Sequence, residues 1–305
     1  MLLGVLAGEG EVAWESREAS TGQGEEELVE LLAREIEEAR AARDRVEAIG
    51  LGIPATIDHE RGIALAAVNL PIADLPIRDL LAERAGLPVF LDNDANVAAL
   101  AEHRFGAGKG TQNMVMLTIG TGIGGGLILG GEIYRGATGA GAELGHVVIE
   151  MDGLPCQGNC PNRGCVETYA SGTALGREGR EAAERAPGSV LGAMLADGKE
   201  VDGVAVTEAA LGGDETALGV FELVGGRLGV ALASLANTFE PETIVIGGGV
   251  MAAGELLLEP ARRELAARAL TPMNRTPVVA AELGQDAGMI GAAAMARIEL
   301  ERAGG

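Results

Sequence analysis

Short apolar runs that end at glycine, proline or polar residues alternate along this chain with segments of helical periodicity. The run "VEAIGLGIP" ends at Pro54, and "LPVFLDND" leads into the helical pattern "ANVAALAEHRFG". Further along, the run "ETIVIGGGV" also comes before a helical segment. Helices that alternate with strands pack on the faces of a sheet, so this order predicts an α/β fold.

The same patterns divide the chain into two α/β lobes. The opening "LLGVLAGEGEVAW" predicts a hairpin whose two apolar runs meet at a Gly-Glu-Gly turn, and residues 169–239 are mostly helical in pattern. A change in composition near residues 106–110 indicates the boundary between the lobes. We therefore expect an N-terminal lobe over residues 1–107, completed by a helix over 286–305, and a C-terminal lobe over 108–285.

The charge of the chain restricts its partners. Its 305 residues carry 45 acidic and only 23 basic side chains, a formal net charge of −22. Nucleic acids and anionic membrane surfaces both attract Lys and Arg, so we expect neither as a partner. Residues 110–131 carry no charged side chain and are numerous enough to span a membrane. Their many glycines and their polar Thr, Gln and Asn predict buried strands around a loop instead.

All three cysteines lie in "HVVIEMDGLPCQGNCPNRGCVE", residues 146–167. Three and four residues separate Cys156, Cys160 and Cys165, and His146 stands ten residues ahead of the first. Three thiolates and one imidazole make a tetrahedral zinc set, so the spacing predicts a closed, structural zinc site in a loop over 146–167. Buried thiols that pack as small hydrophobes, or one disulfide and a free thiol, are the alternatives.

The cysteine count also bears on the compartment. An odd number of cysteines, with no basic leader before the short apolar start of the chain, points to a reducing environment. We therefore expect a cytoplasmic protein.

Polar side chains crowd the sequence "LDNDAN", where an apolar run ends and a helical pattern begins. One Asp or Asn is expected there from helix capping alone, because its side chain accepts hydrogen bonds from free backbone N–H groups. Capping does not account for Asp92, Asn93, Asp94 and Asn96 together. Ligands bind beyond the carboxyl ends of strands in α/β folds, and a carboxylate there can take the proton of a substrate hydroxyl.

Two glycine runs follow predicted strands. "GTGIGGG" over residues 120–126 lacks the lysine of a Walker motif, and it could form a tight hairpin or hold phosphate on backbone N–H groups. "IGGGV" over residues 246–250 could be a simple turn between strand and helix. Neither run identifies a nucleotide site by itself.

Taken in order, the motifs "LDNDAN", "GTGIGGG", "GAELGH", "CPNRGCVETYASG" and "IVIGGGV" closely resemble those of the ROK family of sugar kinases, repressors and open reading frames, and most of all its actinobacterial-type glucokinases. The resemblance implies an actin-like ATPase fold, with two lobes of RNase-H-like topology around a cleft. It also implies ATP-dependent phosphorylation of a hexose with Mg²⁺, most often at the 6-hydroxyl of glucose.

The resemblance assigns roles to individual residues. Asp94 matches the catalytic base, which takes the hydroxyl proton as the γ-phosphoryl group is transferred in line. His146 would serve both zinc and sugar, so that zinc orients the sugar-binding side chains of its loop. The matches to sugar ligands are Asn69, Asn93, Asp94, Glu143, His146 and Glu167. The matches to phosphate- and nucleotide-contacting positions are Thr121, Gly122, Gly247 and Gly248.

The resemblance leaves the substrate and the class of protein open. N-acetylmannosamine, mannose, fructose and allose are alternatives to glucose, and polyphosphate is an alternative donor. A sugar-responsive repressor needs a helix-turn-helix and basic charge, neither of which the sequence contains. A member that binds sugar without turnover is a third class. Because members of the family are commonly dimers, we expect a homodimer.

Two features depart from the family pattern. The first gap between cysteines is wider than the usual Cys-x-Cys-x4-Cys, and we still expect zinc binding. Members of the family begin with a strand and an Asp-x-Gly-Gly-Thr turn that binds phosphate and helps to hold magnesium, and this sequence has no such motif. Loss of a central strand would expose backbone groups and apolar faces of its neighbours. We therefore expect the sequence to start at an internal methionine, about 10–20 residues into a longer protein.

Overall fold

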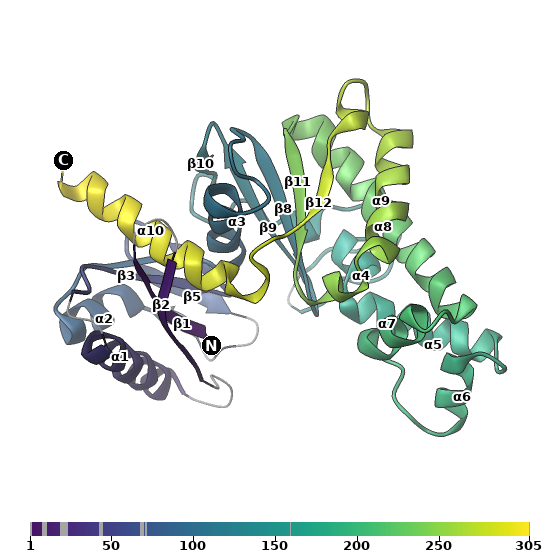
Figure 1. The fold of residues 1–305 in the computed structure, drawn as a ribbon, viewed down its shortest axis with the longest axis horizontal. Helices are drawn as coiled ribbons and strands as arrows, with labels where there is room; N and C mark the ends of the chain where they lie inside the picture. The colour runs from purple at the N-terminus through teal and green to yellow at the C-terminus, as the bar shows by residue number, and fades with distance from the viewer. Residues whose placement is uncertain are drawn as a thin grey trace. The chain divides into compact units, whose positions relative to one another are not determined.

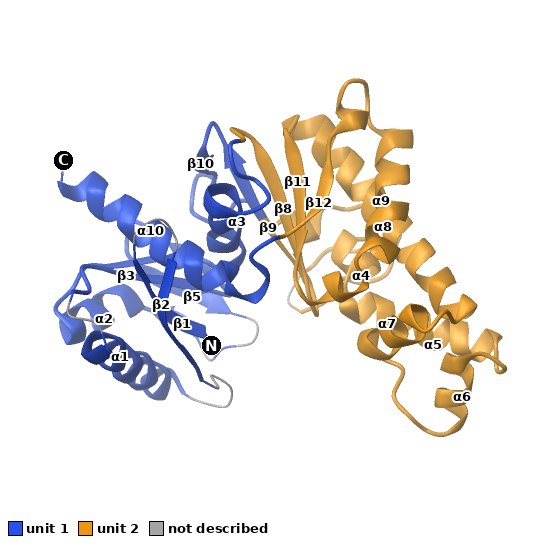
Figure 2. Ribbon diagram, in the orientation of Figure 1, with its two compact units in different colours: residues 1–110, 126–142, 282–305 blue, residues 111–125, 143–281 orange. Residues whose placement is uncertain are grey.

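The structure is a computed structural model, and it describes residues 2–7, 11–18, 24–42, 45–67, 70, 72–158 and 160–304. Strands and helices alternate through most of this length, which confirms the predicted α/β class (Figure 1). The chain divides into two compact units (Figure 2). Unit 1 comprises residues 1–110, 126–142 and 282–305, and unit 2 comprises residues 111–125 and 143–281.

Most strands of unit 1 form three small sheets. These are the antiparallel hairpin of β1 (Leu2–Ala7) and β2 (Glu11–Arg17), the parallel pair of β3 (Ile49–Ile53) and β7 (Val89–Asn93), and the antiparallel sheet of β4 (Ala55–Asp58), β5 (Ile63–Ala67) and β6 (Ala73–Leu75). The hairpin agrees with the sequence prediction. The apolar run that ends at Pro54 is followed at once by a second strand, because the chain bends at this proline and resumes pairing at Ala55.

The helices of unit 1 are α1 (Glu25–Ala42), α2 (Ile77–Ala85), α3 (Asp94–Phe105) and α10 (Ala287–Gly304). The apolar stripe of α1 is buried, with Leu28, Leu32 and Ile36 in one core cluster with the strand residues. α10 packs directly on β3, since a Cβ atom on Gly50 would stand 1.9 Å from the carbonyl oxygen of Ala292. A glycine in β3 is therefore a condition of this packing.

A cavity of about 790 Å³ lies in unit 1. Its lining includes five consecutive residues of β1 (2–6) and six consecutive residues along β3 (49–54). Side chains alternate between the two faces of a strand, so a cavity that touches every residue in turn faces a strand edge. Among the described residues, β1 pairs only with β2, and β3 pairs only with β7. Two unpaired strand edges therefore face one largely apolar cavity, which also reaches Asp94.

A five-stranded sheet has the order β10-β9-β8-β11-β12. Its members are β8 (Met114–Ile119), β9 (Ile123–Leu129), β10 (Glu132–Ile133), β11 (Thr243–Gly247) and β12 (Val278–Ala280). β11 is parallel to both β8 and β12, and all of its residues are buried. The uncharged stretch of residues 110–131 thus forms the buried strands predicted for it, joined by a glycine turn.

Residues 169–239 are mostly helical, as predicted. The helices of unit 2 are α4 (Val166–Ala170), α5 (Gly172–Arg185), α6 (Val190–Ala196), α7 (Gly203–Leu211), α8 (Glu215–Phe239) and α9 (Glu255–Arg268). By length and composition alone, α8 could cross a membrane. Its apolar face is used inside the unit instead: Phe221 is buried, and a Cβ atom on Gly225 would stand 2.4 Å from the Pro260 ring of α9. We read α8 as a core helix of unit 2.

Candidate functional site

The four predicted metal ligands lie together in unit 2. The donor atoms of His146, Cys156, Cys160 and Cys165 are all within 4.8 Å of one another. Cys156 Sγ is 3.5 Å from His146 Nδ1, and Cys160 Sγ is 4.0 Å from Cys165 Sγ. A tetrahedral zinc ion would hold such ligand atoms about 3.5–3.8 Å apart. The donor set and its spacing therefore fit one zinc ion.

Cys165 is the fully buried member of this cluster. Burial, followed by the neighbouring sulfurs of Cys156 and Cys160, raises the pKa of Cys165 to about 12. A thiol in such surroundings stays protonated at neutral pH unless a cation replaces its proton. The cluster is therefore chemically suited to a metal and poorly suited to hold free thiolates.

The backbone of the loop fixes the cysteines in place. The N–H of Cys156 donates to the carbonyl oxygen of Asn162 at 3.0 Å, and the N–H of Gly164 donates to that of Leu154 at 2.8 Å. Gly164 has a φ of 75°, and a Cβ atom there would stand 1.7 Å from the carbonyl oxygen of Glu150. Only glycine fits this position, which immediately precedes the last cysteine.

His146 turns its two ring nitrogens toward different neighbours. Nδ1 faces the Cys156 sulfur, and Nε2 lies 4.0 Å from Oε2 of Glu143. A Cβ atom on Gly145 would stand 2.1 Å from the carbonyl oxygen of Ile123, so the short 3-10 turn η1 (Leu144–His146) packs against the start of β9. One imidazole could thus bind a metal through Nδ1 and face a second ligand through Nε2.

Glu167 connects the cysteine loop to the first glycine turn. Its Oε2 accepts a hydrogen bond from the N–H of Ile123 at 2.7 Å. A Cβ atom on Gly122 would stand 2.3 Å from the same oxygen, and the Cys156 thiol lies 4.0 Å from Oε1. The predicted phosphate turn with Thr121 and the predicted sugar ligand Glu167 are therefore neighbours within unit 2.

The two glycine runs lie at the carboxyl ends of adjacent parallel strands. β8 and β11 pair Thr118 with Gly247, so both strands end at the same edge of the sheet. Gly248 has a φ of 91°, and a Cβ atom there would stand 2.3 Å from the carbonyl oxygen of Ile119. This edge is where ligands bind in α/β sheets, and it gathers the predicted residues Thr121, Gly247 and Gly248.

Asp94 begins α3 directly after β7 in unit 1. Its Oδ1 accepts a hydrogen bond from the N–H of Ala95 at 3.0 Å. The side chain reaches solvent, yet the surrounding protein removes part of its hydration, and this burial raises the pKa of Asp94 against the opposing backbone hydrogen bonds. No cation forms an ion pair with it among the residues that the structure describes. Such a carboxylate is a suitable proton acceptor.

Asn93 is the N-cap of α3. Its Oδ1 accepts hydrogen bonds from the N–H groups of Ala95 at 2.9 Å and Asn96 at 3.4 Å, and its Nδ2 donates to the carbonyl oxygen of Ala55 at 3.4 Å. Helix capping thus accounts for this residue, and its contact with sugar stays a prediction. Asn69 lies outside the described residues.

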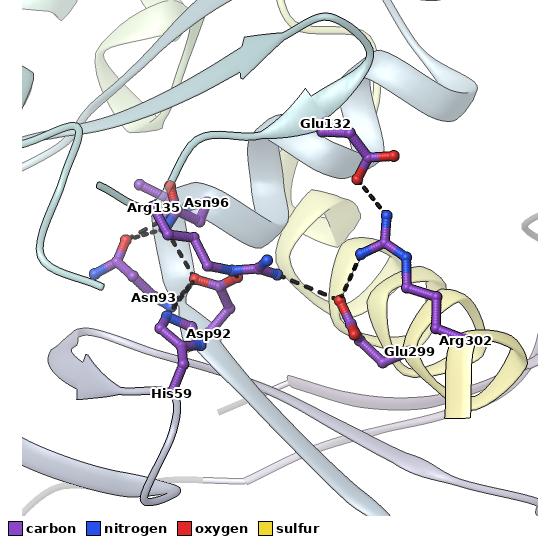
Figure 3. Close-up of polar contacts among 9 residues, drawn as sticks. His59, Asp92, Asn93, Asn96, Glu132, Arg135, Glu299 and Arg302 are labelled. Carbon is purple, nitrogen blue, oxygen red and sulfur yellow. Dashed lines mark hydrogen bonds and ion pairs between the residues drawn. The ribbon is translucent and has the colours of Figure 1, made fainter. Parts of the chain in front are cut away.

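Asp92 is the fully buried residue of the motif (Figure 3). Its carboxylate accepts hydrogen bonds from Arg135 Nε at 2.7 Å, Asn96 Nδ2 at 2.8 Å and the Asn93 N–H at 2.8 Å. His59 Nε2 lies 3.7 Å from the same carboxylate. Burial lowers the pKa of His59, so Arg135 is the cation that balances Asp92.

Sequence reasoning missed Arg135 and His59. Both are far from the polar motif along the chain, and nothing in the spacing links them to it. A signal was nevertheless present for Arg135, which is the one charged side chain between Glu132 and Glu143 in a segment rich in glycine and alanine. Arg is the side chain favoured in buried ion pairs, so its residue type was the signal that the sequence offered.

Comparisons with known proteins agree with this geometry. The profile described as "ROK family" matches residues 2–299. The glucokinase of Thermotoga maritima is 39% identical over 292 residues, which are 95% of this chain and 90% of that protein.

Solved structures give the same result. A ROK family glucokinase from Streptomyces griseus, in complex with glucose and AMPPNP, is similar with a TM-score of 0.84 and 37% identity over 97% of this chain and 95% of that one. A ROK family transcriptional regulator, a homologue of the E. coli MLC protein, also has a TM-score of 0.84, with 31% identity over 93% of this chain and 72% of that one. The predicted resemblance and the actin-like fold class are both confirmed.

Proposed function

Because the chain belongs to the ROK family, we propose that it is an ATP-dependent glucokinase, which transfers the γ-phosphoryl group of ATP to the 6-hydroxyl of glucose. The observation that carries this proposal is the Asp94 carboxylate, which stands at a strand end without an ion-pair partner among the described residues and has a raised pKa. Similarity to glucokinases over nearly the whole chain supports the same activity.

In the proposed reaction, Asp94 takes the proton of the sugar hydroxyl. The hydroxyl oxygen forms a bond to the γ-phosphorus, and the bond from that phosphorus to the bridging oxygen of ADP breaks. ATP is taken as its Mg²⁺ complex, in which the ion neutralises charge on the phosphate oxygens. A raised pKa suits Asp94 to this step, because a base works best when its pKa is near the working pH.

The other site residues keep the roles that their motifs imply. Asn69, Asn93, Glu143, His146 and Glu167 would bind sugar hydroxyls. Thr121 and Gly122 would hold phosphate, and Gly247 and Gly248 would border the nucleotide. This assignment is supported by the link from Glu167 to the glycine turn and by the shared sheet edge of the two glycine runs.

His146, Cys156, Cys160 and Cys165 would hold a structural Zn²⁺. When bound, zinc would supply a fixed charge that keeps the three sulfurs deprotonated. The chain itself then aims the sugar ligands: Nε2 of His146 toward Glu143, and the carboxylate of Glu167 from the helix turn that follows Cys165. Zinc thus acts in orientation rather than in chemistry.

The unit 1 cavity could accommodate one additional strand. Its two walls offer unpaired backbone edges of β1 and β3, which an extended segment could satisfy on both sides at once. Leu2, Leu3, Val5 and Leu6 are only half-buried beside it. Because the cavity reaches Asp94, a turn at the end of such a strand would lie beside the proposed base.

We further propose that the protein is a cytoplasmic homodimer with a role in glycolysis. This proposal agrees with the cysteine usage and with the family. The charge of −22 disfavours nucleic acid and anionic membranes. Likeness to a transcriptional regulator favours a second candidate, a sugar-binding regulator without turnover.

A coupled assay with ATP–Mg²⁺ and a panel of hexoses tests the proposal. We expect turnover to be fastest with glucose, ahead of mannose, N-acetylmannosamine, fructose and allose. Asp94→Asn should lower kcat by about 10²- to 10⁴-fold, because a general base contributes that much, while glucose affinity by isothermal titration is largely kept. Glucose binding without turnover would favour the regulator, and full turnover by Asp94→Asn would remove Asp94 as base.

A further inference from the structure

The carboxylate of Asp92 holds the chain on both sides of Asp94 (Figure 3). Its Oδ1 accepts hydrogen bonds from the N–H of Asn93 and from Nδ2 of Asn96, each at 2.8 Å. Asn93 ends β7 immediately before Asp94, and Asn96 lies in the first turn of α3 immediately after it. A single oxygen therefore fixes the strand end and the helix start between which Asp94 stands.

Arg135 makes this arrangement possible. A fully buried ionised carboxylate is stable only when it is paired and hydrogen-bonded. Nε of Arg135 donates to Oδ2 of Asp92 at 2.7 Å, which leaves Oδ1 free for the two asparagines. His59 is close, but burial lowers its pKa and it does not supply the charge.

The segment that carries Arg135 is itself fixed on unit 1. The N–H of Gly141 donates to the carbonyl oxygen of Arg135 at 2.9 Å. Gly139 has a φ of 88°, and a Cβ atom there would stand 2.4 Å from the carbonyl oxygen of Ile57 and 2.6 Å from Cδ2 of His59. The backbone that carries the Arg135 guanidinium therefore belongs to a closely packed loop.

The arginine side chains of this ion-pair network are more exposed the farther they lie from Asp92. Glu299 lies 3.9 Å from Nη2 of Arg135, and Arg302 pairs with both Glu299 and Glu132 on the far side (Figure 3). The Arg135 side chain is 26% exposed, whereas that of Arg302 is 48% exposed. Exposed ion pairs contribute little, so the inner pair should matter far more than the outer one.

We propose that Asp92 and Arg135 are positioning residues, whose ion pair orients the Asp94 carboxylate toward the substrate hydroxyl. This inference rests on the proposed kinase activity with Asp94 as base. Asp92 is buried and acts through Asn93 and Asn96. Displacement of a catalytic group by about 1 Å can cost about 100-fold in rate, which sets the size of the effect.

The first test compares Arg135→Gln, Arg135→Lys and Asp92→Asn with the unsubstituted chain. We expect kcat to fall about 10- to 100-fold in Arg135→Gln and Asp92→Asn, with the glucose KM little changed, and Arg135→Lys to recover part of the loss. Arg302→Gln is the matched control from the outer end of the same network and should keep kcat. An equal loss in Arg302→Gln, or a loss confined to KM, would contradict the proposal.

The second test separates positioning from general damage to the fold. The double variant Asp92→Asn with Arg135→Gln has lost both charges. Its melting temperature should therefore be closer to that of the unsubstituted chain than the melting temperature of either single variant is, while its kcat stays low. A double variant that regains both melting temperature and kcat would mean that the pair only stabilises the unit.

A double-mutant cycle with Asp94→Asn decides whether the pair acts through Asp94. If it does, Arg135→Gln costs nothing further once Asp94 is replaced, because residues that act as a unit are not additive. Multiplied losses in the double variant would overturn the inference while leaving the proposed function intact. Turnover retained by Asp94→Asn alone, or absent from the unsubstituted chain, would instead contradict the proposed function and this inference with it.

Discussion

The two units differ in how completely each one forms its part of the proposed site. In unit 2, β11 is paired on both sides and fully buried, and the four donor atoms of the cysteine loop lie within 4.8 Å of one another. In unit 1, as far as the structure describes it, β1 and β3 each have an unpaired edge on a cavity of about 790 Å³ that reaches Asp94. The four donor atoms of unit 2 would suit one bound ion, whereas the cavity of unit 1 would suit a segment of chain.

The surroundings of Asp94 show both situations, a part held by contacts within the chain and a part next to a cavity. The turn around Asp94 is held from one side by charges of the chain itself, through Asp92 and Arg135. From the other side it borders a cavity. Backbone groups at a strand edge need partners, and apolar residues that are only half-buried lose much of their stabilising effect. The comparison therefore predicts that filling the cavity changes the protein more than the loss of any residue that supports Asp94 or the metal site.

The largest effect should come from an N-terminal extension. An added apolar strand followed by an Asp-x-Gly-Gly-Thr turn should raise kcat/KM by at least about 100-fold, because each preorganised donor to a transferring group is worth that much. Pairing with both edges should also slow amide hydrogen exchange in β1 and β3 and leave β8 and β11 unchanged. Coupled assays and exchange mass spectrometry measure the two results.

Two matched extensions serve as controls. The same segment with two prolines in its strand cannot donate to both edges, so it should give neither result. The strand with its Asp-x-Gly-Gly-Thr turn replaced by a Gly/Ser segment of the same length should slow exchange without the gain in activity. If the intact extension leaves exchange in β1 and β3 as fast as before, the cavity is not a seat for a strand.

Loss of the metal should have the next largest effect, and it should be confined to unit 2. Cys165→Ser, or removal of zinc by a chelator, should weaken glucose binding about 10- to 100-fold, because the loop would no longer aim His146 and Glu167. Elemental analysis should find one zinc per chain in the unsubstituted protein, and isothermal titration measures the affinity.

Met151→Ala offers a control in the same loop, since its side chain is 84% exposed and is not a proposed ligand. It should keep both zinc and glucose affinity, and zinc added back after chelation should restore binding. Metal-free thiols in the purified protein, or glucose affinity that survives zinc removal, would break the proposed contrast between the units.

The sequence predicted the parts of the molecule that depend on local patterns. The hairpin of β1 and β2 and the strands on either side of the first glycine turn follow from periodicity and are confirmed. The four predicted metal ligands lie within one loop, so their spacing was sufficient to predict that they meet. The short strands β4 and β6 were missed, because three or four residues carry too little pattern.

Long-range pairing accounts for what the sequence did not provide. Helix capping explained one polar residue of "LDNDAN", and the structure assigns that role to Asn93. The buried role of Asp92 depends on Arg135, which is 43 positions away along the chain and is brought close only by folding. Ion pairs between residues far apart along the chain produce no sequence pattern, so only the folded structure reveals them.

The smallest effect concerns the free energy of unfolding of the protein. It should change in opposite directions when Asp94 and Asp92 are each replaced by Asn. Burial raises the folded-state pKa of Asp94, so folding disfavours its ionised form. Asp94→Asn should therefore raise the free energy of unfolding slightly at neutral pH. This increase should shrink as the pH drops through the folded-state pKa of Asp94. It should vanish below the ordinary pKa of aspartate, because Asp94 is then protonated in the folded and the unfolded protein alike. Asp92→Asn should destabilise the protein at neutral pH, since it leaves Arg135 without its buried partner. Urea unfolding of both variants across this pH range measures the two signs, and a stabilising Asp92→Asn or a destabilising Asp94→Asn would show that the motif does not divide into one structural and one functional carboxylate.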